Sequence, residues 1–111
     1  MSAHHYSLLD AIEIELKALA WWETTHPGAE ALASSEPFCL DTLDFSQWLQ
    51  FVLLARLRAM LDAKMPLPSN IAVYPMAFET FKCMPEDTTA LTEAIAQLDE
   101  ALSGQPVIRE A

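Results

Sequence analysis

The residues whose types and spacing could support chemistry are concentrated in the segment 36–58. Asp41 and Thr42 precede an apolar run that contains Arg56, so these three side chains could meet in a cleft and recognise an anionic ligand. Aspartate and threonine at such positions also cap helices, and a buried arginine is more often part of a structural ion pair. The spacing therefore leaves a ligand site and a structural role as alternatives.

Arg56 has the most unusual predicted position in the chain. On a helical wheel it lies within a stripe of apolar residues, where a guanidinium must be paired or must reach water. Glu15, at the border of the first helix's apolar stripe, is the preferred partner, and Asp41 is the second choice. Arg58 falls on the polar side of the same helix and is expected to be solvated.

Other catalytic or metal-binding arrangements are not found in the sequence. His4 and His5 are adjacent, so they would not converge on one metal from a helix or strand. Cys39 and Cys83 have no CxxC spacing and no neighbouring histidine motif, and the chain has no glycine-rich phosphate loop and no GxSxG sequence. We therefore expect no cofactor and no metal. The sequence favours a non-enzymatic protein and leaves an enzyme open.

Apolar residues outside the predicted core indicate a surface for a partner. Ile14 and Trp21 lie seven residues apart on a face opposite the apolar stripe of the first helix, and exposed tryptophans are frequent in interface hot spots. The alternative is that the connector 28–38 covers them. Trp48 and Gln50 are interpreted as core or rim residues of the second helix, with Trp48 in the core and Gln50 nearer the outside.

Four predicted helices must position these residues within one domain of 111 residues, ordered over about 8–103 with frayed termini. Ser7 is expected to cap the first helix, and His26-Pro27-Gly28 to end it. Asp44 and Gln47 match a capping box at the start of the second. The apolar periodicity places the helices at 8–23, 45–63, 75–83 and 87–102. The predicted fold class is all-α, a compact irregular four-helix bundle with prolines in its connectors.

The composition limits the partners. With 6 basic and 16 acidic residues, the net charge of −10 opposes direct nucleic-acid binding and anionic membrane surfaces, and it suits a basic protein partner. The N-terminal residues lack the pattern of a signal peptide, and no apolar run could span a bilayer. A cytoplasmic protein is expected.

One set of motifs carries a resemblance to a known family. It comprises Leu9-xx-Ile12-Glu13-x-Glu15-Leu16, Trp22, Pro37-Phe38-xx-Asp41-Thr42, Trp48-Leu49-Gln50-x-Val52-xxx-Arg56 and Leu67-Pro68. Together these resemble the bacterial YqcC-like family. The resemblance implies a small helical cytosolic protein of unassigned activity, with genes often adjacent to a tRNA pseudouridine synthase.

Two functions are consistent with these observations. The first is a helical module that binds a protein partner or itself through apolar faces that include Ile14 and Trp21, linked to tRNA modification through that partner. The second is a small-molecule or anion-binding protein that uses Arg56, Asp41 and Thr42.

Overall fold

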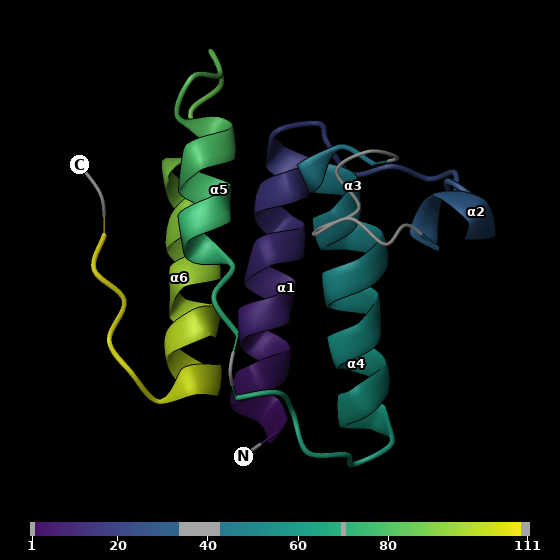
Figure 1. The fold of residues 1–111 in the computed structure, drawn as a ribbon, viewed down its shortest axis with the longest axis vertical. Coiled ribbons are helices and arrows are strands. Elements are labelled where there is room, and N and C mark those ends of the chain that lie inside the picture. The colour runs from purple at the N-terminus through teal and green to yellow at the C-terminus, as the bar shows by residue number, and fades with distance from the viewer. Residues whose placement is uncertain (1, 34–42, 70, 110–111) are drawn as a thin grey trace.

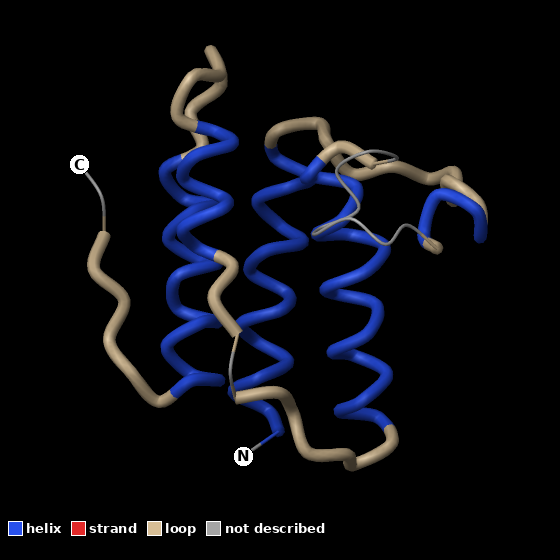
Figure 2. The backbone as a smooth tube through the Cα atoms, viewed as in Figure 1, coloured by secondary structure: helices blue, strands red, loops and turns tan. Residues whose placement is uncertain are grey.

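The computed structural model describes residues 2–33, 43–69 and 71–109 (Figure 1). Within these ranges every regular element is a helix (Figure 2). In chain order they are α1 (Ser2–Ala18), α2 (Ala29–Leu32), α3 (Phe45–Trp48), the π-helix η2 (Leu49–Leu54), α4 (Ala55–Asp62), α5 (Tyr74–Phe81) and α6 (Thr89–Ser103).

The long helices pack side by side as a bundle. The elements α3, η2 and α4 form one continuous rod, because the residues at both junctions keep right-handed helical dihedrals. This rod packs on one side of α1, α6 packs on the other, and α5 lies against α6 (Figure 1). The predicted all-α bundle is confirmed.

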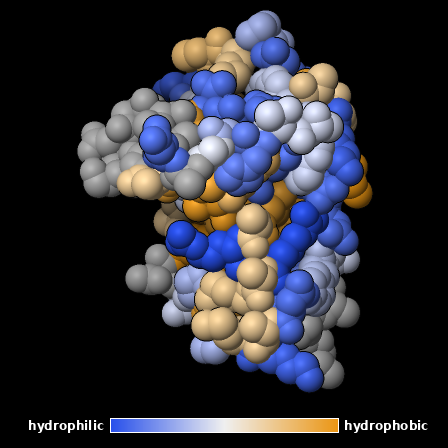
Figure 3. Space-filling view, turned by 90° about the vertical axis from the view of Figure 1, so that its right-hand side faces the viewer, coloured by the Kyte–Doolittle hydropathy of each residue, from blue (hydrophilic) through white to orange (hydrophobic). Residues whose placement is uncertain are grey.

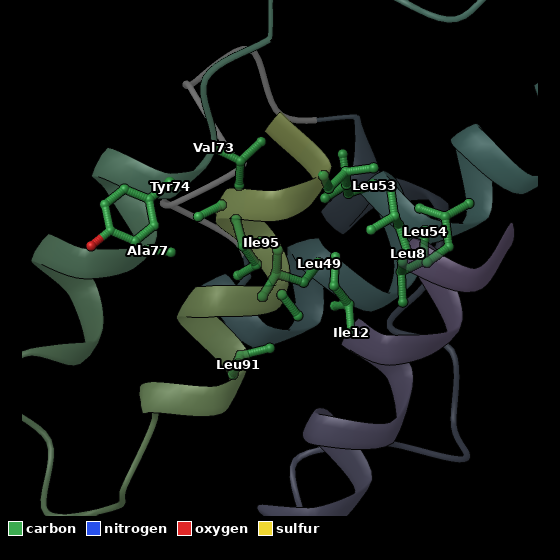
Figure 4. Close-up of a cluster of buried hydrophobic side chains, with 14 of the residues drawn as sticks. Leu8, Ile12, Leu49, Leu53, Leu54, Val73, Tyr74, Ala77, Leu91 and Ile95 are labelled. Carbon is green, nitrogen blue, oxygen red and sulfur yellow. The ribbon is translucent and has the colours of Figure 1, made fainter. Parts of the chain in front are cut away.

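The core lies between α1, the rod and α6. Leu9, Ile12 and Leu16 of α1 are almost completely buried, as the spacing of the apolar residues predicts. The stripe of α6 is buried in the same way and faces them. Figure 4 shows the inner part of this cluster, in which Leu8, Ile12, Leu49, Leu53, Leu54, Val73, Tyr74, Ala77, Leu91 and Ile95 are labelled.

The boundaries of α1 differ from the prediction at both ends. The helix begins at Ser2, so Ser7 is an interior residue and not its cap. Tyr6 extends the helix in this direction because it packs against the core and donates a hydrogen bond from its hydroxyl to Asp62 of α4. At the other end α1 stops at Ala18, well before His26.

A left-handed alanine ends α1. Ala20 has φ 62°, and the N–H groups of Ala20 and Trp21 donate to the carbonyls of Lys17 and Leu16 at 3.0 and 2.9 Å. This pair of hydrogen bonds is a Schellman motif, in which glycine normally occupies the left-handed position. The turn directs Trp21 away from the helix axis.

Ala20→Gly is expected to raise the free energy of unfolding by about 0.5–1 kcal/mol. A left-handed alanine destabilises the folded state by about 1–2 kcal/mol, and glycine removes this strain. Glycine also increases the conformational entropy of the unfolded chain, which offsets part of the gain. Chemical denaturation measures the change. The matched control is Ala18→Gly at the last helical residue, where the backbone is not left-handed and glycine should lower the stability. A loss of stability in Ala20→Gly would contradict this account of the helix end.

The rod confirms the predicted capping box but not the predicted helical wheel. The N–H of Asp44 donates to Oε1 of Gln47 at 2.8 Å, as expected for the box. The wheel assumed 3.6 residues per turn throughout, whereas η2 follows the wider i→i+5 pattern. The wider turns change which side chains face inward, so Leu54 and Leu57 are buried and Val52 is only half-buried.

The N-terminus of α5 is capped from another helix. Pro75 lies in its first turn, as predicted, but the N-cap position is Val73, whose side chain has no acceptor. Asp99 of α6 takes this role, because its Oδ2 accepts a hydrogen bond from the N–H of Tyr74 at 2.7 Å. The Asp99 side chain is 1% exposed, and its other oxygen has no hydrogen-bond partner among the described residues.

The chain beyond α6 remains against the bundle. Gly104, with φ 73°, ends α6 as the sequence predicts. Arg109 then pairs with Glu93 and Glu100 of α6 at 2.8 and 2.7 Å, and its guanidinium lowers the pKa of Glu93 to about 2. The packed region therefore continues past residue 103, the boundary expected from the sequence.

Candidate functional site

The residues singled out in the sequence do not form one site. Ile14 lies on α1 and is 61% exposed, whereas Trp21 follows the end of α1 and is half-buried. The predicted helical face shared by these two residues is wrong, because the helix has ended before Trp21. Asp41 and Thr42 lie outside the described residues.

Gln50 is buried, which corrects the prediction that it lies near the outside. Its side chain is 7% exposed and faces the segment that follows α1. Its Nε2 donates to the carbonyl oxygen of Glu23 at 2.7 Å, and its Oε1 accepts from the N–H of Glu23 at 2.9 Å. One amide side chain thus satisfies both main-chain groups of Glu23 and attaches this segment to η2.

Arg56 is exposed, so the preferred interpretation as a buried ion pair is wrong. It forms no ion pair with Glu15 or with any other residue in the described ranges. Its side chain lies where two shallow hollows meet on the surface of the rod. The first hollow, of about 270 Å³, is otherwise lined by Trp48, Val52, Leu53, Leu57, Pro68, Ile71, Ala72 and Val73.

Arg58 is the arginine that pairs with α1. Its guanidinium contacts Asp10 at 2.8 Å and Glu13 at 2.7 Å, although the sequence placed it in solvent. The ammonium of Lys17, 2.6 Å from the carboxylate of Glu13, and the guanidinium of Arg58 both lower the pKa of Glu13. The two arginines therefore have positions opposite to those predicted. The π-helical turns before α4 explain this difference, because they rotate Arg58 toward α1 and Arg56 away from it.

The second hollow lies on the α2 side of the rod. It is lined by Leu32, Phe51, Val52, Ala55 and Arg56. His26 lies edge-on to Phe51, with ring centroids 5.2 Å apart, so the segment that follows α1 covers part of this apolar surface. Figure 3 looks onto this side and shows an apolar area bordered by hydrophilic residues.

Trp48 is half-buried at the edge of the first hollow. Its ring stacks on Phe45 with centroids 5.7 Å apart and an interplanar angle of 14°. The sequence predicted a core position, and the structure places Trp48 against the core but also along the hollow with Arg56. An indole and a guanidinium beside one apolar hollow could bind an apolar ligand that carries an acid group.

Trp21 lies in a separate groove of about 650 Å³ at the end of the bundle. The groove lies between the end of α1, the start of α3 and the end of α5. Trp21 contacts Phe81 there, with ring centroids 5.2 Å apart. Sequence reasoning did not identify this groove, because its residues come from three distant segments. They are Ala20, Trp21, Glu23, Leu43, Asp44, Phe45, Ser46, Thr80, Phe81, Met84, Pro85 and Glu86.

The described side chains that line these hollows are mainly apolar, with charged residues at the borders. No three His, Cys, Asp or Glu residues among them are arranged to hold a metal ion. None of the helices in the same ranges combines the length and apolar character needed to cross a membrane.

Comparison with known proteins identifies the family. The model of a family of unknown-function domains, DUF446, described as tRNA pseudouridine synthase C, matches residues 4–101. The chain belongs to this YqcC-like family. The solution structure of Escherichia coli YqcC has a TM-score of 0.77 to the present fold at 28% identity, over 99% of this chain and 94% of that one.

Three curated relatives extend the comparison. An uncharacterised protein of Haemophilus influenzae is 38% identical over 79% of this chain and 83% of its own length. The uncharacterised protein YqcC of Escherichia coli is 39% identical over 60% of this chain and 62% of its own length. A tRNA pseudouridine synthase C of Pectobacterium carotovorum is 45% identical over 58% of this chain, and the match spans 17% of that longer protein.

The structure explains part of the motif that carries the YqcC-like resemblance. In Trp48-Leu49-Gln50, the tryptophan lines the hollow beside Arg56, the leucine is fully buried and the glutamine holds Glu23. Three adjacent residues of the rod thus line the surface, pack in the core and hold the segment that follows α1. The motif is therefore explained mainly by folding, with Trp48 as its surface residue.

Proposed function

We propose that this chain is a non-enzymatic helical module that binds a protein, and that its partner is a tRNA pseudouridine synthase. The observation that carries this proposal is the relative named tRNA pseudouridine synthase C, in which a 64-residue segment is 45% identical to this chain. That segment is a small part of the synthase. A helical unit that resembles a segment of an enzyme is a candidate to contact the rest of a related enzyme.

Charge supports a role beside an enzyme over direct contact with tRNA. Binding to the phosphates of RNA requires clustered Lys and Arg residues, and this chain has a net charge of −10. A tRNA-binding enzyme must carry basic surface, so electrostatic attraction would favour its association with an acidic module. The described surfaces, which are apolar hollows with charged borders, suit contact with a protein.

Co-expression with the tRNA pseudouridine synthase C of the same bacterium tests the proposal. We expect one stoichiometric complex in size-exclusion chromatography with light scattering, unchanged after nuclease treatment. The chain alone should form no pseudouridine in tRNA. Separate elution of the two proteins at micromolar concentration would contradict the partner, and loss of the complex with nuclease would show that RNA joins them.

A second function is favoured by the position of Arg56. This exposed cation lies beside Trp48 at an apolar hollow, which suits an apolar small molecule with a carboxylate or phosphate. Asp41 and Thr42, proposed from the sequence to complete this site, lie outside the described residues. This function would be favoured if the chain eluted separately from the synthase and such ligands stabilised it against unfolding. Arg56→Met should then abolish the stabilisation.

A further inference from the structure

The groove at the end of the bundle has an aromatic floor. Trp21 and Phe45 both pack on Phe81, with ring centroids 5.2 and 5.6 Å from it. Met84, which is 41% exposed, forms part of the wall. Phe45 and Phe81 are buried, so of these three rings Trp21 is the one that offers apolar contact and a negative π face to a cation.

Three carboxylates from three segments border this floor. Glu23 follows α1, Asp44 precedes α3, and Glu86 follows α5. Glu23 accepts one hydrogen bond at its side chain, from Nε2 of Gln47 at 3.2 Å, and Asp44 belongs to the capping box. Glu86 makes no hydrogen bond and no ion pair in the part of the chain that the structure describes.

None of these three carboxylates forms an ion pair with a described residue. Elsewhere each described cation except Arg56 and Lys64 is already paired. The pairs are Lys17 with Glu13, Arg58 with Asp10 and Glu13, Lys82 with Glu79, and Arg109 with Glu93 and Glu100. The border of the groove therefore carries three carboxylates that are not neutralised by an ion pair among the described residues.

The carboxylates on two sides of the groove are held in place before any partner binds. Gln50 fixes the main chain of Glu23 through two hydrogen bonds, and Gln47 contacts both Glu23 and Asp44. A preformed site loses little conformational entropy on binding, which increases the affinity available from each contact.

We propose that this groove docks a basic segment of the protein partner. An Arg or Lys side chain would lie over the partly exposed ring of Trp21, with its charge between Glu23, Asp44 and Glu86. This inference rests on the proposed function and specifies the chemistry of the partner's contact. A second copy of this chain fits poorly because both copies carry a charge of −10, and the carboxylates would repel the phosphates of an RNA.

A matched pair of charge variants tests the groove. Glu23→Gln with Glu86→Gln removes two carboxylates from its border, whereas Glu15→Gln with Glu30→Gln removes two that do not line it. Both changes raise the net charge equally. Isothermal titration with the synthase should give about tenfold weaker binding for the groove pair and a change within about twofold for the control pair.

A second measurement does not depend on the synthase. A short amidated peptide of alternating Gly and Arg is titrated into the labelled protein, and the indole N–H signal of Trp21 is followed by NMR. We expect a saturable shift, weakened by salt and by the groove pair more than by the control pair. The same peptide with Glu in place of Arg should cause no shift.

The outcomes separate the two proposals. If the synthase binds tightly and the groove and control variants weaken its binding equally, the groove is not the docking site, although the proposed function still stands. A shift of Trp21 that depends on the groove carboxylates, with no binding of the synthase, would support the groove and reject that partner. The docking proposal would also be wrong if the Arg peptide did not shift the indole signal of Trp21 and both variants bound the synthase equally well.

Discussion

Replacing Gln50 by leucine is expected to lower the free energy of unfolding by about 3 kcal/mol. The substitution keeps the size of the side chain but removes both hydrogen bonds to the main chain of Glu23. Each main-chain group left without a partner in a partly buried position costs about 1–3 kcal/mol. Urea denaturation followed by circular dichroism measures the loss.

Gln97→Leu is the matched control for this prediction. Gln97 is exposed on α6 and its side chain bonds only Glu93, which lies on the same helix, so the change should stay within about 0.5 kcal/mol. Equal stability of Gln50→Leu and the wild type would mean that the attachment of the connector to η2 contributes little. Retained stability with a loss of partner binding would instead assign Gln50 to a contact surface.

Replacing Asp99 by alanine is expected to destabilise the protein by about 2 kcal/mol at neutral pH. The N–H of Tyr74 would lose its acceptor at a buried helix N-terminus, with a cost of about 1–3 kcal/mol. Removal of a buried carboxylate offsets part of this loss. Asp99→Asn keeps an acceptor oxygen and should cost less than the alanine variant.

The pH dependence of Asp99→Asn provides a sharper test. Burial raises the pKa of the Asp99 carboxyl above 3.8, although the N–H groups of Tyr74 and Val73 act in the opposite direction. The contribution of this group to stability is therefore fully present below pH 3.8 and is lost as pH rises through the raised pKa. The variant lacks this titration, so its stability relative to the wild type should increase with pH. A difference that does not change with pH would contradict the burial of a titrating carboxyl.

The existence and order of the helices could be predicted because their apolar residues recur every three or four positions. The Asp44–Gln47 box and Gly104 also marked helix ends correctly, since their local chemistry determines the backbone. The end of α1 could not be predicted, because Ala20 adopts a left-handed conformation that alanine rarely takes. Tertiary contacts, including the packing of Trp21 on Phe81, favour the left-handed conformation of Ala20 in the folded protein.

The candidate site was harder to predict than the fold. A helical wheel with a constant period misplaced Gln50, Arg56 and Arg58, because a π-helix changes the direction of each following side chain. Trp21 was identified as an interface candidate from its type, but its neighbours were not. Phe45, Phe81 and Glu86 come together only when separate elements pack, so no local pattern indicated the groove.

The capping of α5 by Asp99 also links folding to binding. An eight-residue helix is too short to be stable in isolation, and here its first turn depends on a side chain from α6. Local unfolding of α5 would therefore separate it from α6 and remove Phe81 from Trp21 and Phe45, while α1 and the rod stay packed. Phe81 at the end of α5 belongs to the groove, so such an opening would dismantle it. By thermodynamic linkage, a partner seated there would shift this equilibrium toward the closed helix, and α5 would become more resistant to opening in the complex than in the free chain.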